Sequence, residues 1–268
     1  MKCRLGRRLG SRHTGLVAVS ICLATGCTSS HSSNPSVSSD QAARSALRSQ
    51  QDEASANLRY QIGRSVDGRD IWAYQLGDPD STESILVVGC VHGDEPAGIA
   101  VAQLVIRGRQ LADANVLVIP NLNPDGVAAG TRQNAHGVDL NRNFPYRWRR
   151  PSARGTRYYA GTAPLSEPES RAAMTLIDRF HPQISIWFHQ PYGVVDQSGG
   201  DVRIERRFSR LIGLPLERLP RYPGSITGWE NHHMVGTTAF VVELPAGAHM
   251  PTTARRYADA VVDFAAGV

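Results

Sequence analysis

The sequence predicts a single α/β domain whose largely parallel sheet is covered by helices on both faces. Continuous apolar runs of strand length occur at "SILVV", "NVLVI", "ISIWF" and "AFVV", which is typical of strands buried on both faces. Segments with helical spacing of apolar residues alternate with these runs. The chain has 268 residues, 41% of them hydrophobic and 20% charged, a length and balance that one globular domain can have.

Residues 1–26 have the features of an export signal. Basic residues crowd the first 12 positions, and the apolar run Gly15–Ala24 follows them. This run is too short to span a bilayer as a mature helix and fits the central region of a signal peptide. It leads into "LATGC", which resembles the lipobox of bacterial lipoproteins. We therefore expect cleavage before a lipidated Cys27 and a protein on the outer face of a membrane, with a plain secretory signal or a twin-arginine signal as alternatives.

Residues 27–57 are rich in serine and other small polar residues. Such a segment buries too little apolar surface to fold, so it predicts a flexible tether. The folded domain is expected over residues 58–268. Of the four cysteines, only Cys90 would remain unmodified in this domain, which excludes an intramolecular disulfide.

Within the domain, the elements are predicted in chain order. The segment 58–77 predicts a hairpin, because "VDGRD" supplies Asp-Gly turn chemistry between two strand-like runs. A buried strand and a helix follow, and a second strand then ends in a loop. Ser166 and Glu169 suggest a capping box at the start of a helix that runs to about Phe180. The other predicted elements, in chain order, are a strand at 84–91, a helix at 96–111, strands at 115–124 and 183–190, a helix at 203–212, a strand at 238–245 and a helix at 253–264.

The basic charge does not indicate nucleic-acid binding. The formal net charge is +5, and Lys2 is the only lysine, so arginine supplies almost all of it. The densest run, Arg147–Arg157, is interrupted by proline and glycine. This composition favours a solvated loop over a nucleic-acid surface.

Three of the predicted strands end in a residue that can bind metal or move protons. These residues are His92, His189 and Glu243. Ligands bind outside the carboxyl ends of the strands in open α/β sheets. One strand-end histidine is more often an ordinary surface residue, but three such groups at equivalent positions predict a common site.

Glu95 follows His92 by three positions and opens the predicted helix, with Gly93 in the turn between them. This turn can bring the imidazole and the carboxylate toward one point. Two histidines and one glutamate with an open fourth position form a catalytic zinc arrangement. His189, from a neighbouring strand, would complete it.

The stretch "GTRQNAHGVDLNRNFP" (130–145) adds groups for binding a carboxylate and a carbonyl. Arg132 and Arg142 offer guanidinium donors, and Asn141 adds an amide. Asp139 is placed to accept the free N–H of a zinc-bound histidine. Taken alone, the stretch could also be a polar turn with solvated arginines.

Together, "HGDE", "NPDG", "DLNRNFP", the strand-end histidine and the strand-end glutamate resemble the zinc carboxypeptidase family, in the same order along the chain. The likeness extends over about residues 85–245 and is greatest to the murein peptide amidase branch. It implies a mixed sheet of about eight strands between helices. It also implies hydrolysis of cell-wall peptides at the bond between γ-D-glutamate and a diamino acid.

The resemblance further implies roles for individual residues. It implies one zinc ion held by His92, Glu95 and His189, with Glu243 as the catalytic base. Arg132 would polarise the scissile carbonyl, while Asn141 and Arg142 would hold the substrate's carboxylate. Alignment through "YPGSITGW" places Leu219 where digestive carboxypeptidases have a mobile tyrosine, and the nearby Tyr222 is a candidate for that place.

Two other functions fit parts of the pattern. A zinc deacylase of the aspartoacylase or succinylglutamate desuccinylase type shares H-x-x-E and an "NR" motif, but "NPDG" and the export signal favour the peptidase. A non-catalytic lipoprotein that binds peptidoglycan would retain Arg142 but would not need all four residues of the zinc site. The sequence leaves the oligomeric state and any regulatory partner open.

Overall fold

The computed structural model describes residues 58–108, 111, 113–149, 152–247 and 251–267. These residues form an α/β fold built on one mixed sheet of eight strands. The strands are β1 Leu58–Arg64, β2 Asp70–Gly77, β3 Ser84–Val88, β4 Asn115–Ile119, β5 Ile184–His189, β6 Val194–Asp196, β7 Leu216–Glu217 and β8 Thr238–Glu243.

The strand order is β1-β2-β4-β3-β5-β8-β6-β7. The four central strands, β4, β3, β5 and β8, run parallel to one another. Antiparallel pairs join β2 to β4 on one side and β6 to β8 on the other. Every residue of the four central strands is buried, which is why their sequences are continuous apolar runs instead of alternating ones.

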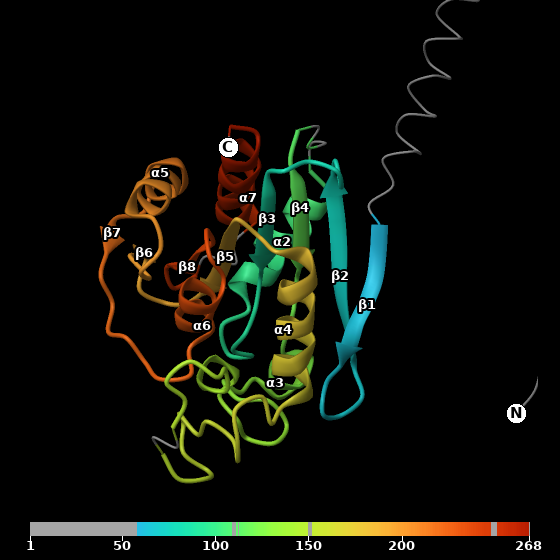
Figure 1. The fold of residues 1–268 in the computed structure, drawn as a ribbon, viewed down its shortest axis with the longest axis vertical. Helices are drawn as coiled ribbons and strands as arrows, with labels where there is room; N and C mark the ends of the chain where they lie inside the picture. The colour runs from blue at the N-terminus through green and yellow to red at the C-terminus, as the bar shows by residue number, and fades with distance from the viewer. Residues whose placement is uncertain (1–57, 109–110, 112, 150–151, 248–250, 268) are drawn as a thin grey trace, which may run out of the picture. The chain divides into compact units, whose positions relative to one another are not determined.

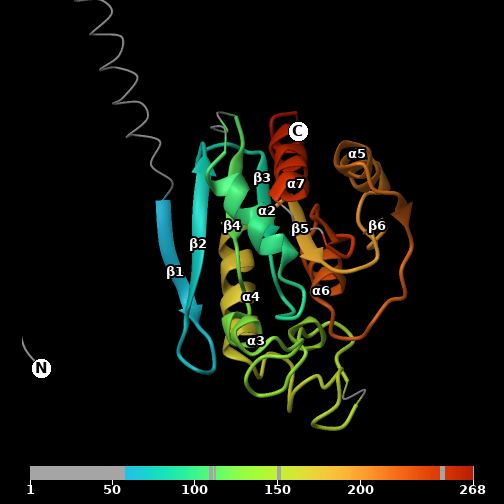
Figure 2. The same ribbon diagram turned by 180° about the vertical axis from the view of Figure 1, so that it is seen from behind.

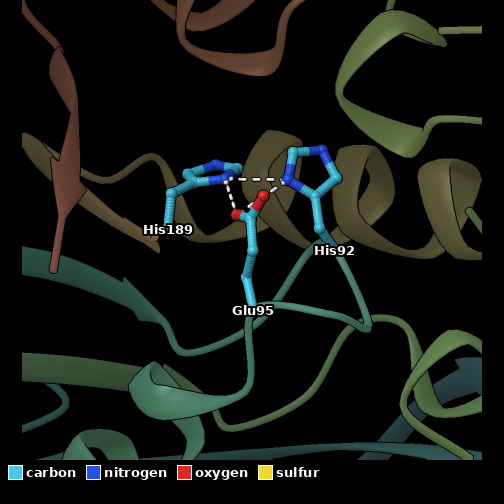
Figure 3. Close-up of side chains that lie close together, drawn as sticks. All are labelled: His92, Glu95 and His189. Atoms are coloured by element: carbon cyan, nitrogen blue, oxygen red, sulfur yellow. Dashed lines mark hydrogen bonds and ion pairs between the residues drawn. The ribbon is translucent and has the colours of Figure 1, made fainter. Parts of the chain in front are cut away.

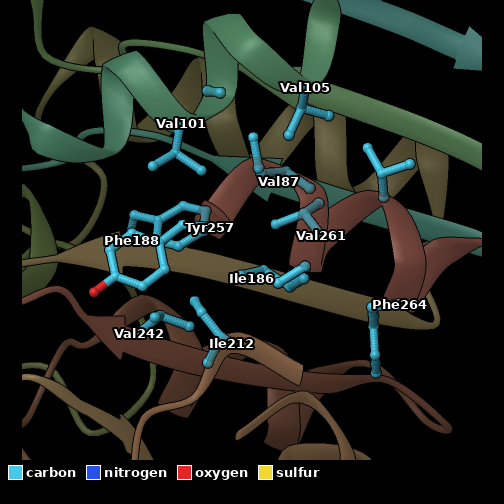
Figure 4. Packing of buried hydrophobic residues seen from close by; sticks show 14 of the residues in the cluster. Val87, Val101, Val105, Ile186, Phe188, Ile212, Val242, Tyr257, Val261 and Phe264 are labelled. Carbon is cyan, nitrogen blue, oxygen red and sulfur yellow. The ribbon is translucent and has the colours of Figure 1, made fainter. Parts of the chain in front are cut away.

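Helices cover both faces of the sheet (Figures 1 and 2). On one face, α2, α5 and α7 pack over β3, β5 and β8 in a cluster that includes Val101, Phe208 and Val261 (Figure 4). On the other face, α4 and α6 contribute Ile177 and Trp229 to a second cluster. The helices are α2 Ala97–Ile106, α3 Pro124–Ala129, α4 Pro168–Phe180, α5 Val202–Ile212, α6 Ile226–His233 and α7 Pro251–Ala265, with a 3-10 turn, η1, at Leu140–Arg142.

The predicted capping box at Ser166 and Glu169 is wrong. Helix α4 begins at Pro168, after Glu167 as its N-cap, and that cap makes no side-chain hydrogen bond. The Ser166 hydroxyl instead donates to the Glu167 carboxylate. Glu169 accepts from the backbone of Val66 and from the side chain of Asn134, so long-range contacts engage the groups that a capping box would use.

Several short elements were not predicted, namely β6, β7, α3, η1 and α6. They have eight residues or fewer, and so carry little periodic signal. The predicted signal, lipid anchor and tether at residues 1–57 lie outside the described residues. Among the residues that the structure describes, no helix is both long and apolar enough to cross a membrane.

Candidate active site

The predicted strand-end residues meet at one edge of the sheet. His189 is the last residue of β5 and Glu243 is the last of β8, and the two are paired neighbours in the parallel register. His92 and Glu95 lie in the turn between β3 and α2. Because β3 is hydrogen-bonded to β5, this turn lies beside the end of β5.

The backbone around the turn is closely packed. Gly93 lies against Gly126 of α3, and a Cβ atom at Gly93 would overlap the carbonyl group of Gly126. Asn123 caps α3 by accepting from the Gly126 N–H at 2.9 Å, and its amide donates to the carbonyl of Val91 at 3.0 Å. The "NPDG" motif therefore holds α3 against the segment that carries His92 and Glu95.

His92, Glu95 and His189 form a buried cluster that could hold a metal ion, with candidate ligand atoms all within 4.8 Å of one another. The Nδ1 atoms of the two histidines are 3.0 Å apart, and each is 3.0 Å from Glu95 Oε2. Figure 3 shows both rings turned toward the carboxylate. The three side chains therefore converge on one point.

The hydrogen bonding of His92 fits a metal ion. His92 Nε2 lies 3.0 Å from Asp139 Oδ1, and the carboxylate can only accept, so this ring nitrogen carries the proton in a neutral imidazole. The lone pair of His92 is then on Nδ1, facing the second histidine and Glu95. A cation at the convergence point would satisfy this donor set, and two nitrogens with one carboxylate oxygen suit Zn²⁺.

Arg132 joins the cluster from its rim. Its Nη1 donates to Glu95 Oε1 at 2.9 Å, and its Nε donates to Asp139 Oδ2 at 2.9 Å. Burial alone would raise the pKa of Asp139, but His92 and Arg132 outweigh it and hold that pKa well below its usual range. Asp139 is therefore a fixed anion that orients both His92 and Arg132.

Glu243 lies in a different electrostatic environment. Burial and the nearby charge of Glu95 raise the pKa of Glu243 to about 7. Its Oε2 atom is buried and has no hydrogen-bond partner among the described residues. Glu243 also lines the cavity beside the cluster, and a carboxyl group with a pKa near neutrality is suited to accept and return a proton.

A cavity of about 300 Å³ opens beside the cluster. Arg142 lines it and is only 5% exposed. Its Nη1 donates to the backbone carbonyl of Asn141 at 2.7 Å, and no carboxylate pairs with it among the described residues. Burial lowers the pKa of Arg142, and the charge of the nearby Asp139 opposes this effect without outweighing it.

Aromatic rings flank this arginine. The Tyr222 ring centroid is 4.2 Å from Arg142 Cζ, and the Tyr158 centroid is 5.6 Å away. Both tyrosines line the cavity, as does Leu219. The Asn141 side chain accepts from the backbone N–H of Ile226 at 3.0 Å, which fixes the amide beside the start of α6.

The sequence did not point to several residues of the cavity wall. Tyr158, Arg157, Tyr192, Asp196 and Arg221 all line it. Arg157 closes the arginine-rich run that we interpreted as a solvated loop, and its side chain is indeed 56% exposed while bordering the cavity. Loops bring these residues to the site, and no local pattern marks them.

Residues 45–195 match the family model described as zinc carboxypeptidase. The chain belongs to the zinc carboxypeptidase family. It is accordingly a hydrolase, and the fold of its described residues agrees with that of other members.

Two relatives of this zinc carboxypeptidase are named murein peptide amidase A. The protein from Escherichia coli (strain K12) is 33% identical over 162 residues, which cover 56% of this chain and 66% of the relative, slightly under two thirds of its length. The protein from Vibrio campbellii is 30% identical over 196 residues, which cover 68% of this chain and 77% of the relative.

Solved structures agree with this placement. The murein-tripeptide amidase from Escherichia coli O157 superposes with a TM-score of 0.64 and 27% identity, covering 78% of this chain and 92% of the other. The carboxypeptidase A from Helicoverpa armigera has a TM-score of 0.69 at 17% identity, covering 81% and 70% of the two chains. The second likeness is one of fold alone.

Proposed function

We propose that this zinc carboxypeptidase hydrolyses bacterial cell-wall peptides at the bond between γ-D-glutamate and a diamino acid. The named activities of the Escherichia coli and Vibrio campbellii relatives support a cell-wall peptide as the substrate. The cavity of about 300 Å³ beside the cluster has a volume within the range of small-ligand pockets.

The observation that carries the proposal is the buried guanidinium of Arg142, which has no carboxylate partner among the described residues. A buried charge without a partner is costly, so such a group is expected to receive an anion from a ligand. The α-carboxylate of a C-terminal amino acid fits, because a guanidinium binds carboxylate in a two-pronged geometry. Arg142 lines the same cavity as the His-Glu-His cluster, so a peptide held by its terminal carboxylate would present its last bond to that cluster.

The proposed roles follow from the contacts described above. His92, Glu95 and His189 would hold zinc, which when bound lowers the pKa of water and polarises a carbonyl. Glu243 accepts a proton from the attacking water and delivers it to the leaving amine. Arg132 donates hydrogen bonds to the carbonyl oxygen as negative charge develops there.

Further residues would position the substrate and the ligands. Asp139 keeps His92 in the required tautomer. Arg142 and Asn141 bind the free carboxylate, and the Tyr222 ring packs against the guanidinium of Arg142.

The test compares two peptides that end in γ-D-glutamyl-diaminopimelate. One has a free carboxylate on the carbon next to the scissile amide, and its twin is amidated there. Wild type should cleave the amidated twin roughly 30- to several thousand-fold more slowly, because leaving Arg142 unpaired costs about 2–5 kcal/mol. Arg142→Ala should lose activity mainly on the free acid.

Equal cleavage of the twins by wild type would remove the carboxylate-binding role from Arg142. Mass spectrometry of a muropeptide digest identifies the bond that is cut. Release of acyl groups from N-acyl amino acids, with no action on muropeptides, would instead support the deacylase alternative.

We also propose that the protein is exported and anchored to the outer face of a membrane through a lipid on Cys27. The basic N-terminus, the apolar run and "LATGC" support this location. Labelled fatty acid should enter the wild-type protein in cells but not Cys27→Ser. Labelling of both proteins to the same extent would exclude this anchor.

A further inference from the structure

A second hollow, of about 490 Å³, borders the active-site cavity. The two share Arg221, Tyr222 and Ser225 as lining residues. Arg221 and Tyr222 therefore line both spaces, where one adjoins the other.

The charge of this second hollow has one sign. Its formally charged lining side chains are all arginines and no carboxylate lines it, among the residues that the structure describes. The arginines are Arg147, Arg149, Arg218 and Arg221, and all four are exposed. Such a lining attracts an anionic group and disfavours a bare ammonium group.

Arg221 is the best held of these arginines. Its Nη1 lies 2.7 Å from Asp196 Oδ2 and 3.3 Å from the backbone oxygen of Leu219. Asp196 is itself fixed, because it also accepts from the backbone N–H of Leu219 at 2.8 Å and from the hydroxyl of Ser198 at 2.7 Å. The Arg221 side chain is 39% exposed, and its Nε and Nη2 atoms have no hydrogen-bond partner in the described part of the chain, so they can bind a ligand.

Arg221 also lies next to the wall that holds the leaving amino acid. Tyr222 follows it directly, and that ring packs on Arg142, the group assigned above to the carboxylate of the released residue. The side chain of the released amino acid would therefore lie in a cavity whose wall includes Arg221.

We propose that Arg221 is a specificity-determining residue that binds a carboxylate at the end of the leaving amino acid's side chain. This inference rests on the proposed function. It states that Arg221 determines which diamino acid the enzyme accepts. Diaminopimelate carries a carboxylate and an amine at its far end, whereas lysine carries the amine alone. The distal carboxylate of the first can bind the free Nε and Nη2 atoms of Arg221, and the second has no such carboxylate.

The experiment measures kcat/KM for three γ-D-glutamyl peptides that release diaminopimelate, lysine or 2-aminopimelate. Lysine is diaminopimelate without the distal carboxylate, and 2-aminopimelate is diaminopimelate without the distal amine. Wild type should cleave the diaminopimelate and aminopimelate peptides at similar rates. It should cleave the lysine peptide more slowly by about tenfold or more, because a charge-assisted pair is lost and an ammonium faces arginine.

Arg221→Gln should erase this preference by slowing cleavage of the two carboxylate-bearing peptides, with the lysine peptide unchanged or faster. Arg221→Lys, which keeps the charge but loses the two-pronged geometry, should retain part of the preference. Arg210→Gln, at an exposed position on α5, is the matched control and should leave all three values unchanged. Thermal melts show whether each variant is folded.

The two proposals fail in different ways. If folded, metal-loaded wild type releases none of the three amino acids, the proposed function is wrong. If it releases lysine as efficiently as diaminopimelate, or if Arg221→Gln keeps the wild-type preference, the role of Arg221 is wrong while the proposed function stands.

Discussion

Glu243 combines burial, a pKa raised to about 7 and an oxygen without a partner among the described residues. Glu243→Gln should keep the fold and the bound metal but lose turnover by roughly 10²–10⁴-fold, because an amide cannot accept the water's proton. Steady-state kinetics with metal analysis of the same sample measures both properties. Glu217→Gln, at an exposed position on β7, is the control and should retain wild-type turnover.

The same carboxyl group sets a pH dependence. Glu243 acts as a base only when ionised, so activity should rise with pH through its pKa. A bound cation favours the carboxylate and lowers that pKa, which places the rising limb at or below about pH 7. For the Glu243→Gln variant described above, activity within about tenfold of wild type would contradict the role of Glu243 as the base.

Among single residues, the sequence predicted those that stand at or directly after the ends of strands. The carboxyl ends of parallel strands share one edge, so His189 and Glu243 could be placed together before any coordinates were known. Tyr158 and Arg221 could not be placed in the cavity wall. Long loops position them, and the paths of those loops depend on distant contacts such as the ion pair between Asp196 and Arg221.

Among the elements, α6 depends on a buried carboxyl group. Glu230 accepts from the Ser185 hydroxyl at 2.5 Å and from the Trp187 indole at 2.7 Å, which ties α6 to β5. The first residue of α6, Ile226, donates its N–H to Asn141. The helix therefore connects the core of the sheet to a residue assigned to substrate binding.

Burial raises the pKa of Glu230 to about 7, although Ser185 and Trp187 favour its ionised form. Between about pH 4.5 and pH 7 the folded protein keeps a proton here that the unfolded chain has released, so Glu230 lowers stability as pH rises. Glu230→Gln should match wild type near pH 4.5 and exceed its stability by up to about 3 kcal/mol near pH 8. Denaturant unfolding of both proteins across this range tests it, and a pH-independent difference would contradict it.

The length of a helix or strand determines whether the sequence predicts it. Long segments such as α4 and β5 carry enough periodicity or apolar length to identify them. Helix α6 has only eight residues and follows a Pro-Gly turn, so its sequence carries too little periodic signal to predict it. At α4 the capping pattern was present, but Asn134 and Val66 engage Glu169 instead, and such long-range competition leaves no mark in the local sequence.

For the molecule as a whole, metal binding and stability should be coupled. His189 is 94 residues away from Glu95 in the sequence, so the complete site forms only in the folded state, and a ligand of that state stabilises it. Removing zinc with a chelator should lower the melting temperature by roughly 5–10 °C. This shift corresponds to the loss of about 2.7 kcal/mol of stabilisation, which a ligand provides at a hundredfold excess over its Kd. Differential scanning calorimetry measures the shift, and added zinc should reverse it.

His189→Ala provides the internal comparison for this coupling. It removes one of the three candidate ligands, so neither the chelator nor added zinc should move its melting temperature. Full zinc retention by this variant would mean that the third ligand is another residue. An unchanged melting temperature after complete removal of zinc from wild type would separate metal binding from folding.

The contact between Gly93 and Gly126 has a consequence for how this protein can change over generations. A methyl group at Gly93 would overlap the backbone of α3, and one at Gly126 would overlap Asn123 and the carbonyl of Gln133. The first would push the His92–Glu95 turn away from the place where its two side chains meet His189. The second would displace Asn123, whose amide holds the carbonyl of Val91 next to that turn. Selection for activity should therefore keep both positions as glycine, even in lineages where the cavity wall drifts freely toward new substrates.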